Sequence, residues 1–550
     1  MLSFPQLPFG LYPNEIKMAI AAKYLIKFLK SQQAEMKKLV LFQLFIFVFA
    51  YHLSYLMSES LSEGLLQRYE VQVSGSDGCT PLWLDANKYG LSSLSSFNGY
   101  VRGGLERPLE VDDEKKWGIG YGLDLVAPLH YTSDFVIQQC YAEVRYKHAV
   151  LTVGQKELPI QLKNMELSSG SQTLGINARP IPGMRLSFPD YWCIPGLHSW
   201  LAIKGHFSFG WMTDGHFQKE WTKGLTRYSN GVLYHDKAGY LRIGPGDTGS
   251  PFSLELGLEM ACEFGGKIYR HGKSTIYGHT GFRAYIEAFT AGGDDESGNV
   301  VYPNVAGDQL GSWIARLNYD NDRLGISIYA DHYFEDHSSM FLLDYDGYGS
   351  GKDWDTWETN RYLLYPLKDI MIGGELKLKT FQWIDGVVVE FLNTRYQSGP
   401  IYHDHTKSIS DHLGGIDSYY NHGQYPGWSH WGQVMGNPLY RSPIYNTDGS
   451  LSIKDNRFYA WHFGMSGNLL SNLRYRLLCS WQKGYGTYSS PFLYPQENLS
   501  MMGEMTYQFK GNGLLKHCTI KLAGGFDKGE LLGNNLGCQM TFQFKIPAKR

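Results

Sequence analysis

The stretch KWGIGYGLDLV, from Lys116 to Val126, decides the fold class because its side chains alternate in size with period two. Every second residue is large and apolar: Trp117, Ile119, Tyr121, Leu123 and Leu125. The residues between them are nearly bare: Gly118, Gly120, Gly122 and Asp124. Period two predicts an extended strand whose successive side chains point to opposite faces of a sheet. A soluble sheet places its bulk toward a core and polar groups toward water, so the aromatic face here needs another environment.

The composition of the 550-residue chain is typical of an all-β protein with many turns. Aromatic residues make up 15%, there are 63 glycines, and only 19% of residues are charged. The formal net charge of -3 predicts no nucleic-acid partner. The seven cysteines form no CxxC pair and are interpreted as small apolar side chains. A disulfide framework or a metal site is the alternative.

A short apolar segment near the N-terminus predicts a secretory signal peptide. The basic start Met36–Lys38 precedes the apolar run Leu39–Ala50, whose last residues fit a small-residue cleavage rule. A membrane-spanning helix needs about 20 apolar residues, and this run is shorter. The alternative is an N-terminal anchor helix that extends to Leu56.

These features divide the chain into three parts. Residues 36–50 are predicted to be the signal peptide, and residues 51–550 are predicted to be the mature domain. A signal peptide should start a protein, so residues 1–35 are interpreted as a gene-model extension or leader. The competing interpretation is a folded helix over Ile16–Leu29.

The alternation of the opening stretch recurs along the rest of the chain. Further examples lie within residues 201–211, 254–263, 313–319, 473–481 and 538–546. Their polar faces carry charges of both signs, and aromatic residues often end the apolar faces. Segments of this kind predict an outer-membrane β-barrel, apolar toward lipid and polar toward the lumen. Backbone groups within lipid must be satisfied internally, so such a sheet must close.

The spacing of these segments supports the same fold. Tight polar turns are predicted at residues 145–149, 235–239 and 318–323. Long connections are predicted at residues 157–197, 331–367 and 398–457. Short periplasmic turns that alternate with long extracellular loops are typical of outer-membrane barrels. At roughly 25–30 residues per strand and connection, the mature length gives on the order of 16–18 antiparallel strands.

Charges on the predicted inner face indicate a closed lumen. Three groups share single strands: Glu143 with Arg145 and Lys147, Glu375 with Lys377 and Lys379, and Glu255 with Glu259 and Glu263. The last group would need partners such as Arg474 and Arg476. Unpaired buried charge is costly, which favours a plugged lumen with paired charges. The alternative is a wide pore whose charges stay in water.

Several short strings resemble catalytic motifs, but their copy number, spacing or surroundings do not fit the chemistry of those motifs. No enzyme is therefore predicted. The sequence DTGS at Asp247–Ser250 occurs once, whereas the aspartic-protease mechanism needs two such aspartates. The histidines of His332–His337 have the wrong spacing for a zinc motif, and His403–His405 is a short loop cluster. We therefore expect no cofactor and no metal. A secreted β-rich glycoside hydrolase is the enzymatic alternative.

Two loops have a composition typical of sugar binding, residues 353–362 and 419–432. Aromatic rings can stack on sugars, and Asp or Asn can hydrogen-bond their hydroxyl groups. The candidate carbohydrate-binding residues are Trp357, Tyr419, Tyr420, Trp428, Trp431, Asp353, Asp355 and Asn421. The alternative is that these aromatics pack the loops onto one another as a lid without a ligand.

A series of strings in a fixed order resembles a known family. They lie at residues 181–192, 397–405, 417–421, 436–439, 484–488 and 526–537, and begin with IPGMRLSFPDYW. Together they resemble the capsule-assembly Wzi-type outer-membrane proteins, in the form found in the Bacteroides group of Gram-negative bacteria. The resemblance extends from about Tyr100 to the C-terminus. The chain departs from the usual barrel ending, because Pro547–Arg550 follows the last apolar strand in place of a terminal aromatic residue.

The resemblance implies an eighteen-stranded barrel, closed inside, that acts as a surface lectin in the outer membrane. Such a protein would bind nascent capsular polysaccharide and help attach it to the cell surface. Its expected partners are capsular polysaccharide, outer-membrane lipid and other capsule export components. The main alternative from the barrel pattern is an outer-membrane channel or porin for saccharides.

Overall fold

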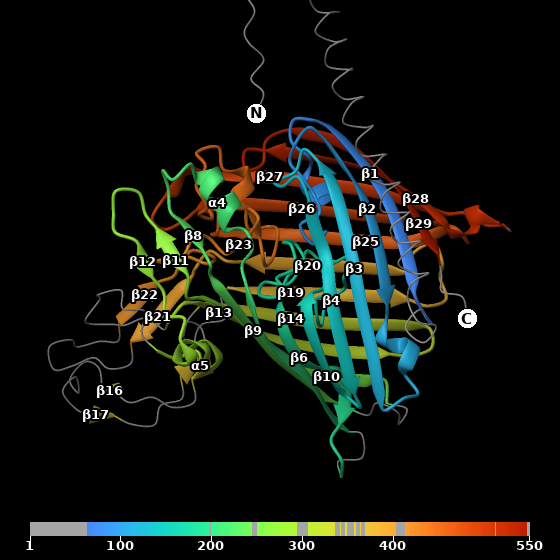
Figure 1. Ribbon diagram of the computed structural model, residues 1–550, viewed down its shortest axis with the longest axis horizontal. Coiled ribbons are helices and arrows are strands. Elements are labelled where there is room, and N and C mark those ends of the chain that lie inside the picture. The colour runs from blue at the N-terminus through green and yellow to red at the C-terminus, as the bar shows by residue number, and fades with distance from the viewer. Residues whose placement is uncertain are drawn as a thin grey trace, which may run out of the picture.

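The computed structural model describes residues 63–196, 200–244, 250–293, 306–335, 369–402, 413–511 and 513–546, and four short strands between 341 and 364. Eighteen strands form one large sheet (Figure 1). These strands are β1 (Leu66–Asp77), β2 (Phe97–Arg107), β3 (Trp117–Leu129), β4 (Val136–Tyr146), β5 (Ala149–Gln155), β6 (Gly183–Cys193), β7 (Leu201–Trp211), β9 (Leu233–Ile243), β10 (Phe252–Phe264), β13 (Asp308–Asp320), β14 (Leu324–Glu335), β19 (Ile370–Leu378), β20 (Gly386–Asn393), β25 (Phe458–Leu470), β26 (Leu473–Gly486), β27 (Pro491–Gln508), β28 (Cys518–Gly529) and β29 (Asn535–Ile546).

Smaller elements lie in the connections between these strands. The helical ones are α3 (Leu82–Asp85), η1 (Leu109–Asp112), α4 (Gly215–Thr222), α5 (Phe282–Thr290), η3 (Pro443–Tyr445) and η4 (Leu514–His517). The short strands are β8 (Tyr228–Asn230), β11 (Lys267–Tyr269), β12 (Ile276–Tyr277), β15 (Phe341–Leu342), β16 (Gly347–Tyr348), β17 (Trp357–Glu358), β18 (Leu363–Leu364), β21 (Ser398–Tyr402), β22 (Leu413–Ile416), β23 (Ser429–His430) and β24 (Gln433–Val434).

The sheet closes on itself as an antiparallel barrel. Each barrel strand pairs with the next, and β1 pairs with β2 on one side and with β29 on the other. Val71 of β1 lies opposite both Val101 and Phe542. Closure pairs the two strands that would otherwise be exposed edges. The predicted all-β barrel of about eighteen antiparallel strands is therefore confirmed.

Strand β3 explains the bare face of the opening stretch. Its large apolar residues face outward, and the residues between them are buried on the inner face: Gly118, Gly120, Gly122 and Asp124. A Cβ atom on Gly120 would lie 2.7 Å from Glu143, and one on Gly122 would lie 2.5 Å from the ring of Tyr141. The glycines therefore make room for bulky inward-facing side chains of the neighbouring strand β4.

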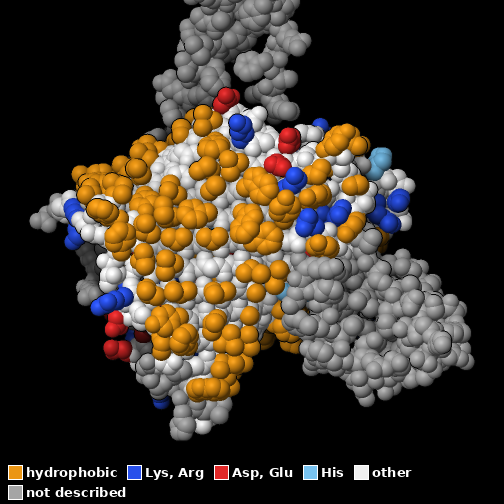
Figure 2. Space-filling model, turned by 180° about the vertical axis from the view of Figure 1, so that it is seen from behind, with side chains coloured by type: hydrophobic (Ala, Val, Ile, Leu, Met, Phe, Trp, Pro, Cys, Tyr) orange, Lys and Arg blue, Asp and Glu red, His pale blue; other side chains and the backbone are white. Residues whose placement is uncertain are grey.

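The exterior of the barrel is apolar. Figure 2 shows hydrophobic side chains gathered over the wall. Exposed outward-facing residues come from many strands, including Ile137, Leu151, Phe207, Leu256, Ile328, Trp461, Leu522 and Met540. A closed sheet with an apolar outer band satisfies its backbone internally and fits the hydrocarbon of a bilayer. The protein is thus a transmembrane barrel of the outer membrane.

The two ends of the barrel differ in their connections. Two residues, Lys147 and His148, join β4 to β5, and residues 321–323 join β13 to β14. The other end carries long connections, including residues 156–182, 212–232, 265–307 and 394–457, with α4 in the second of these and α5 in the third (Figure 1). Short turns mark the periplasmic end of such barrels, so the long connections are extracellular. The turns predicted at 145–149 and 318–323 are confirmed.

Three sequence-based boundaries need correction. Residues 235–239 lie within β9 and form no turn. The segment resembled a turn in the sequence because His235 and Lys237, which face outward, are polar. The connection predicted at 157–197 contains strand β6 (Gly183–Cys193), and the one predicted at 331–367 begins later, because β14 continues to Glu335. The long connection at 398–457 is confirmed within residues 394–457.

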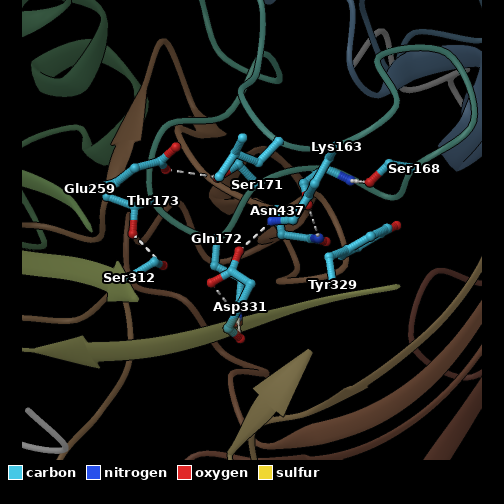
Figure 3. Close-up of polar contacts among 12 residues, drawn as sticks. Lys163, Ser168, Ser171, Gln172, Thr173, Glu259, Ser312, Tyr329, Asp331 and Asn437 are labelled. Atoms are coloured by element: carbon cyan, nitrogen blue, oxygen red, sulfur yellow. Dashed lines mark hydrogen bonds and ion pairs between the residues drawn. The ribbon is translucent and has the colours of Figure 1, made fainter. Parts of the chain in front are cut away.

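The lumen is filled by connections that fold inward, mainly residues 78–96, 156–182 and 417–457. Their apolar side chains form one buried cluster with the wall, including Trp83, Leu167, Tyr420, Trp428 and Tyr440. Polar contacts tie residues 156–182 to the strands (Figure 3). Ser171 donates to Glu259 at 3.1 Å, and Lys163 forms an ion pair with Asp331 in which both side chains are fully buried. The predicted plug is therefore present.

Several inner charges form ion pairs, but not all as predicted. Glu143 pairs with Lys156 at 2.7 Å, and Glu375 pairs with Arg316 at 2.5 Å. The predicted pairing of Glu255, Glu259 and Glu263 with Arg474 and Arg476 is wrong, because β10 and β26 are not adjacent in the barrel. Instead, Glu259 accepts hydrogen bonds from the plug and from β9, and Arg474 and Arg476 pair with Glu166 and Glu504 respectively.

The predicted N-terminal segments lie outside the described residues. This applies to the signal peptide at 36–50 and to the extension or leader at 1–35. Among the residues that the structure does describe, no helix has the length and apolarity needed to cross a membrane.

All seven cysteines are free thiols.

Candidate functional site

Three of the eight predicted sugar-binding residues lie where the structure gives no side chains. Asp353 and Asp355 are outside the described residues. For Trp357, the structure describes the backbone, which pairs with Tyr348 between strands β17 and β16. The placement of these three side chains therefore stays a prediction.

Three other candidates, Tyr419, Tyr420 and Trp428, are 0% exposed. The hydroxyl of Tyr419 donates to Asp369 at 3.1 Å, and the Tyr420 ring lies 4.1 Å from that of Tyr440, between centroids. Trp428 donates its backbone N–H to the Tyr420 carbonyl at 2.9 Å. Their expected placement on the loop surface is corrected, because the 417–457 connection folds into the lumen and buries these large rings.

The last two candidates differ in role. Asn421 exchanges two hydrogen bonds of 2.9 Å with the backbone of Ile453, which fixes the connection. Trp431 is partly exposed at the extracellular end. The guanidinium of Arg179 lies 4.3 Å from the centroid of its ring, and its Nε1 donates to Thr213 at 3.1 Å. Among the candidates in residues 419–432, Trp431 is therefore the one whose aromatic ring remains near the surface.

A cavity of about 310 Å³ lies between the plug and the inner wall formed by β5, β6, β7 and β9. It follows β6 from Gly183 to Pro189, a path of roughly 20 Å at about 3.3 Å per residue. Arg179 and Met435 line it nearer the extracellular end, and Lys204 lies farther along the wall. The cavity therefore follows more than half of β6.

The cavity lining is strongly basic. It contains the cations Lys156, Arg179, Arg185 and Lys204, and one carboxylate, that of Asp236. Asp236 is already engaged, because it contacts Arg185 at 3.1 Å and His206 at 2.9 Å. Lys156 is neutralised by Glu143, which lies behind the lining. The positive charge of the cavity therefore comes mainly from Arg179 and Lys204.

Arg179 and Lys204 form no ion pair with a carboxylate in the described part of the chain. Arg179 donates to the hydroxyls of Ser133 and Thr132, both at 2.9 Å, and burial lowers its pKa to about 10. Lys204 donates to the amide oxygen of Gln161 at 2.7 Å. Their hydrogen-bond partners are neutral, so both cations can serve as stations for an anionic ligand.

No local sequence pattern reveals this basic cavity. Lys204 lies on the polar face of the alternating segment 201–211, so its inward direction was predictable. Arg179 gave no comparable signal, because it lies in a non-alternating connection. Its position depends on how residues 156–182 fold back into the lumen.

The structure gives no support for metal chemistry in the residues it describes. Within those residues, no group of three or more His, Cys, Asp or Glu side chains is arranged to hold a metal ion. His332, part of a string that resembles a zinc motif, lies on β14, and its Nδ1 is 2.8 Å from the backbone oxygen of Asp369.

No protein-family model matches the chain, and neither does any curated protein. Among solved structures, the chain is similar to OprD of Pseudomonas aeruginosa, with 9% identity and a TM-score of 0.42 over 89% of this chain and 96% of that one. OpdQ of the same organism has 9% identity and a TM-score of 0.44, covering 90% and 100%. OccAB4 of Acinetobacter baumannii has 9% identity and a TM-score of 0.41, covering 89% and 100%.

Proposed function

We propose that this protein is a narrow outer-membrane channel for small anionic solutes, including acidic saccharide units, and that it catalyses no reaction. The observation that carries the proposal is the basic cavity along β6. Its length, its position beside the barrel wall and its two cations, which form no ion pair within the described residues, together suit a solute path.

The plug determines the width of such a path. Wide diffusion is disfavoured, because buried aromatic side chains and the Lys163–Asp331 ion pair fill the centre of the lumen. The cavity of about 310 Å³ runs beside this plug and is large enough for a small ligand. Passage would thus be off-axis and selective.

The charge pattern determines which solutes would enter. Arg179 lies nearer the extracellular end of the barrel and Lys204 farther along β7, so an anion could pass from one cation to the other. Walls of low dielectric focus the field of these charges and raise the local anion concentration. Several weak stations let a solute enter and leave, whereas one tight site would trap it.

Replacing Lys204 by glutamate is expected to convert anion preference into cation preference, because the change reverses the charge at the second station. The measurement is the reversal potential of the purified barrel in planar bilayers under a salt gradient. The control is Lys219→Glu, which makes the same charge change on the exposed helix α4. If the parent shows no conductance, or if both variants leave the ion preference unchanged, the channel proposal fails.

A second proposed function is the attachment of capsular polysaccharide to the cell surface. In this function the protein would act with the other capsule export components that the family resemblance implies. The observation in its favour is Trp431, whose partly exposed ring stacks on Arg179 at the extracellular end. An aromatic ring beside a cation can contact an acidic sugar, and many weak contacts along a polymer add by avidity.

Replacing Trp431 by alanine is expected to release capsule into the medium while the barrel stays folded, because the stacking surface is lost. The measurement is the ratio of cell-bound to released polysaccharide, with heat-modifiable migration on gels to confirm folding. Leu225→Ala, which also removes an exposed apolar side chain from an extracellular connection, is the control. Unchanged retention in the Trp431 variant would contradict this second function.

A further inference from the structure

Helix α5 (Phe282–Thr290) packs on the outside of the barrel wall. Its buried residues Ala284 and Ala288 form a cluster with Cys262 and Phe264 of β10. On β10 the inward positions hold Glu259, Ala261 and Glu263, so Cys262 and Phe264 face outward by alternation. The helix therefore covers a part of the wall that would otherwise face lipid.

Two polar residues beneath the helix support this placement. His235 and Lys237 lie opposite Cys262 and Met260 in the β9–β10 register and thus share their outward face. The ammonium of Lys237 donates to the carbonyl of Phe289, near the C-terminal end of α5. The His235 ring stacks on Phe209 of β7, with 4.4 Å between centroids, and His235 is 1% exposed. The helix thus shields polar groups that lipid could not solvate.

Apolar side chains of α5 outside the Ala284–Ala288 face are exposed. Phe282 is 83% exposed, Ile286 47% and Phe289 43%. With Tyr285 and Phe209 these side chains line a cleft of about 420 Å³ between the helix and β7. An apolar cleft of this kind would be unfavourable in water.

The surroundings of the cleft indicate what occupies it. Phe209 continues the outward row of Phe207 and Trp211 on β7, so the cleft is continuous with the lipid-facing band. It lies at the extracellular ends of the strands, which is the level of the outer leaflet.

We propose that α5 is an interfacial helix whose cleft with β7 binds an acyl chain of an outer-leaflet lipid. Amphipathic helices at the membrane interface bury their apolar faces near the headgroup and acyl boundary. Here the barrel fixes the helix through Lys237 and the Ala284–Ala288 face, so the exposed Phe282 and Ile286 are free to contact lipid. This site is separate from the lumenal cavity and is independent of the proposed transport.

Photo-crosslinking in native outer membranes tests the proposal. The photoreactive residue p-benzoylphenylalanine is placed at Ile286 in one variant and at Leu225 in another. Leu225 is 63% exposed in the connection after α4 and provides the matched control. Irradiation is expected to give a lipid adduct at position 286 and none at 225, as measured by mass spectrometry of the purified barrel.

Phe282→Ser provides a second measurement, because its highly exposed side chain forms one wall of the cleft without entering the packed face. We expect the purified variant to lose a bound lipid that the parent and Leu225→Ser retain in native mass spectra, with heat-modifiable migration unchanged. Equal crosslinking at positions 286 and 225, a protein adduct at 286, or retention of the lipid by Phe282→Ser would overturn the proposal.

Discussion

Replacing Lys163 by methionine is expected to lower the free energy of unfolding by about 3–5 kcal/mol. The side chains of Lys163 and Asp331 are both 0% exposed, and their ion pair joins the plug to strand β14. Removing one partner leaves the other as an uncompensated buried charge, which is the costly case. Urea titration of the barrel in detergent, followed by tryptophan fluorescence, measures the loss.

Two controls separate this effect from a general loss of charge. Lys379→Met breaks the ion pair with Asp320, whose side chain is 63% exposed, and should cost about 0–1 kcal/mol. Combining Lys163→Met with Asp331→Leu removes both buried charges and should restore most of the stability. If Lys163→Met cost no more than Lys379→Met, the plug would not be held by a buried pair.

The second large effect concerns the outer wall. Leu123→Arg is expected to destabilise the barrel by about 2–4 kcal/mol, because arginine at the bilayer midplane is poorly solvated. Leu123 is the seventh of thirteen residues in β3 and faces outward between Leu105 and Cys140. Equilibrium unfolding from lipid vesicles gives the value.

Depth in the membrane provides the control for this prediction. Trp117 faces the same side but starts the strand, so Trp117→Arg should cost only about 0–1 kcal/mol near the interface. Equal losses at the two positions would contradict the placement of β3 across the membrane. An unaffected Leu123→Arg variant would contradict the outward direction of this face.

Local alternation was sufficient to predict the barrel. In β3, β10 and β26 the period of two fixed which side chains share a face, and an apolar face with charged groups opposite is compatible with lipid outside and a lumen inside. The same rule failed at residues 235–239. There the outward His235 and Lys237 are polar because α5 covers them, and no local pattern reveals a helix that arrives from another connection.

The candidate site was less predictable for a related reason. A loop rich in tyrosine and tryptophan has the same composition whether it faces solvent or folds inward. Here the loop folds inward and buries Tyr419, Tyr420 and Trp428. Pairing of the inner charges also depends on strand order, which placed β10 and β26 apart. The basic cavity brings together Arg179 from a connection and Lys204 from β7.

The sequence by itself thus determined the all-β class, the direction of side chains along each regular strand and the transmembrane character of the wall, because these depend on neighbours one or two residues away. Only the tertiary structure decided where the inward connections rest, which charges meet and which aromatic rings stay exposed. Those outcomes depend on contacts between residues far apart in the chain, such as Lys163 with Asp331 and Arg179 with Trp431, which no local pattern specifies.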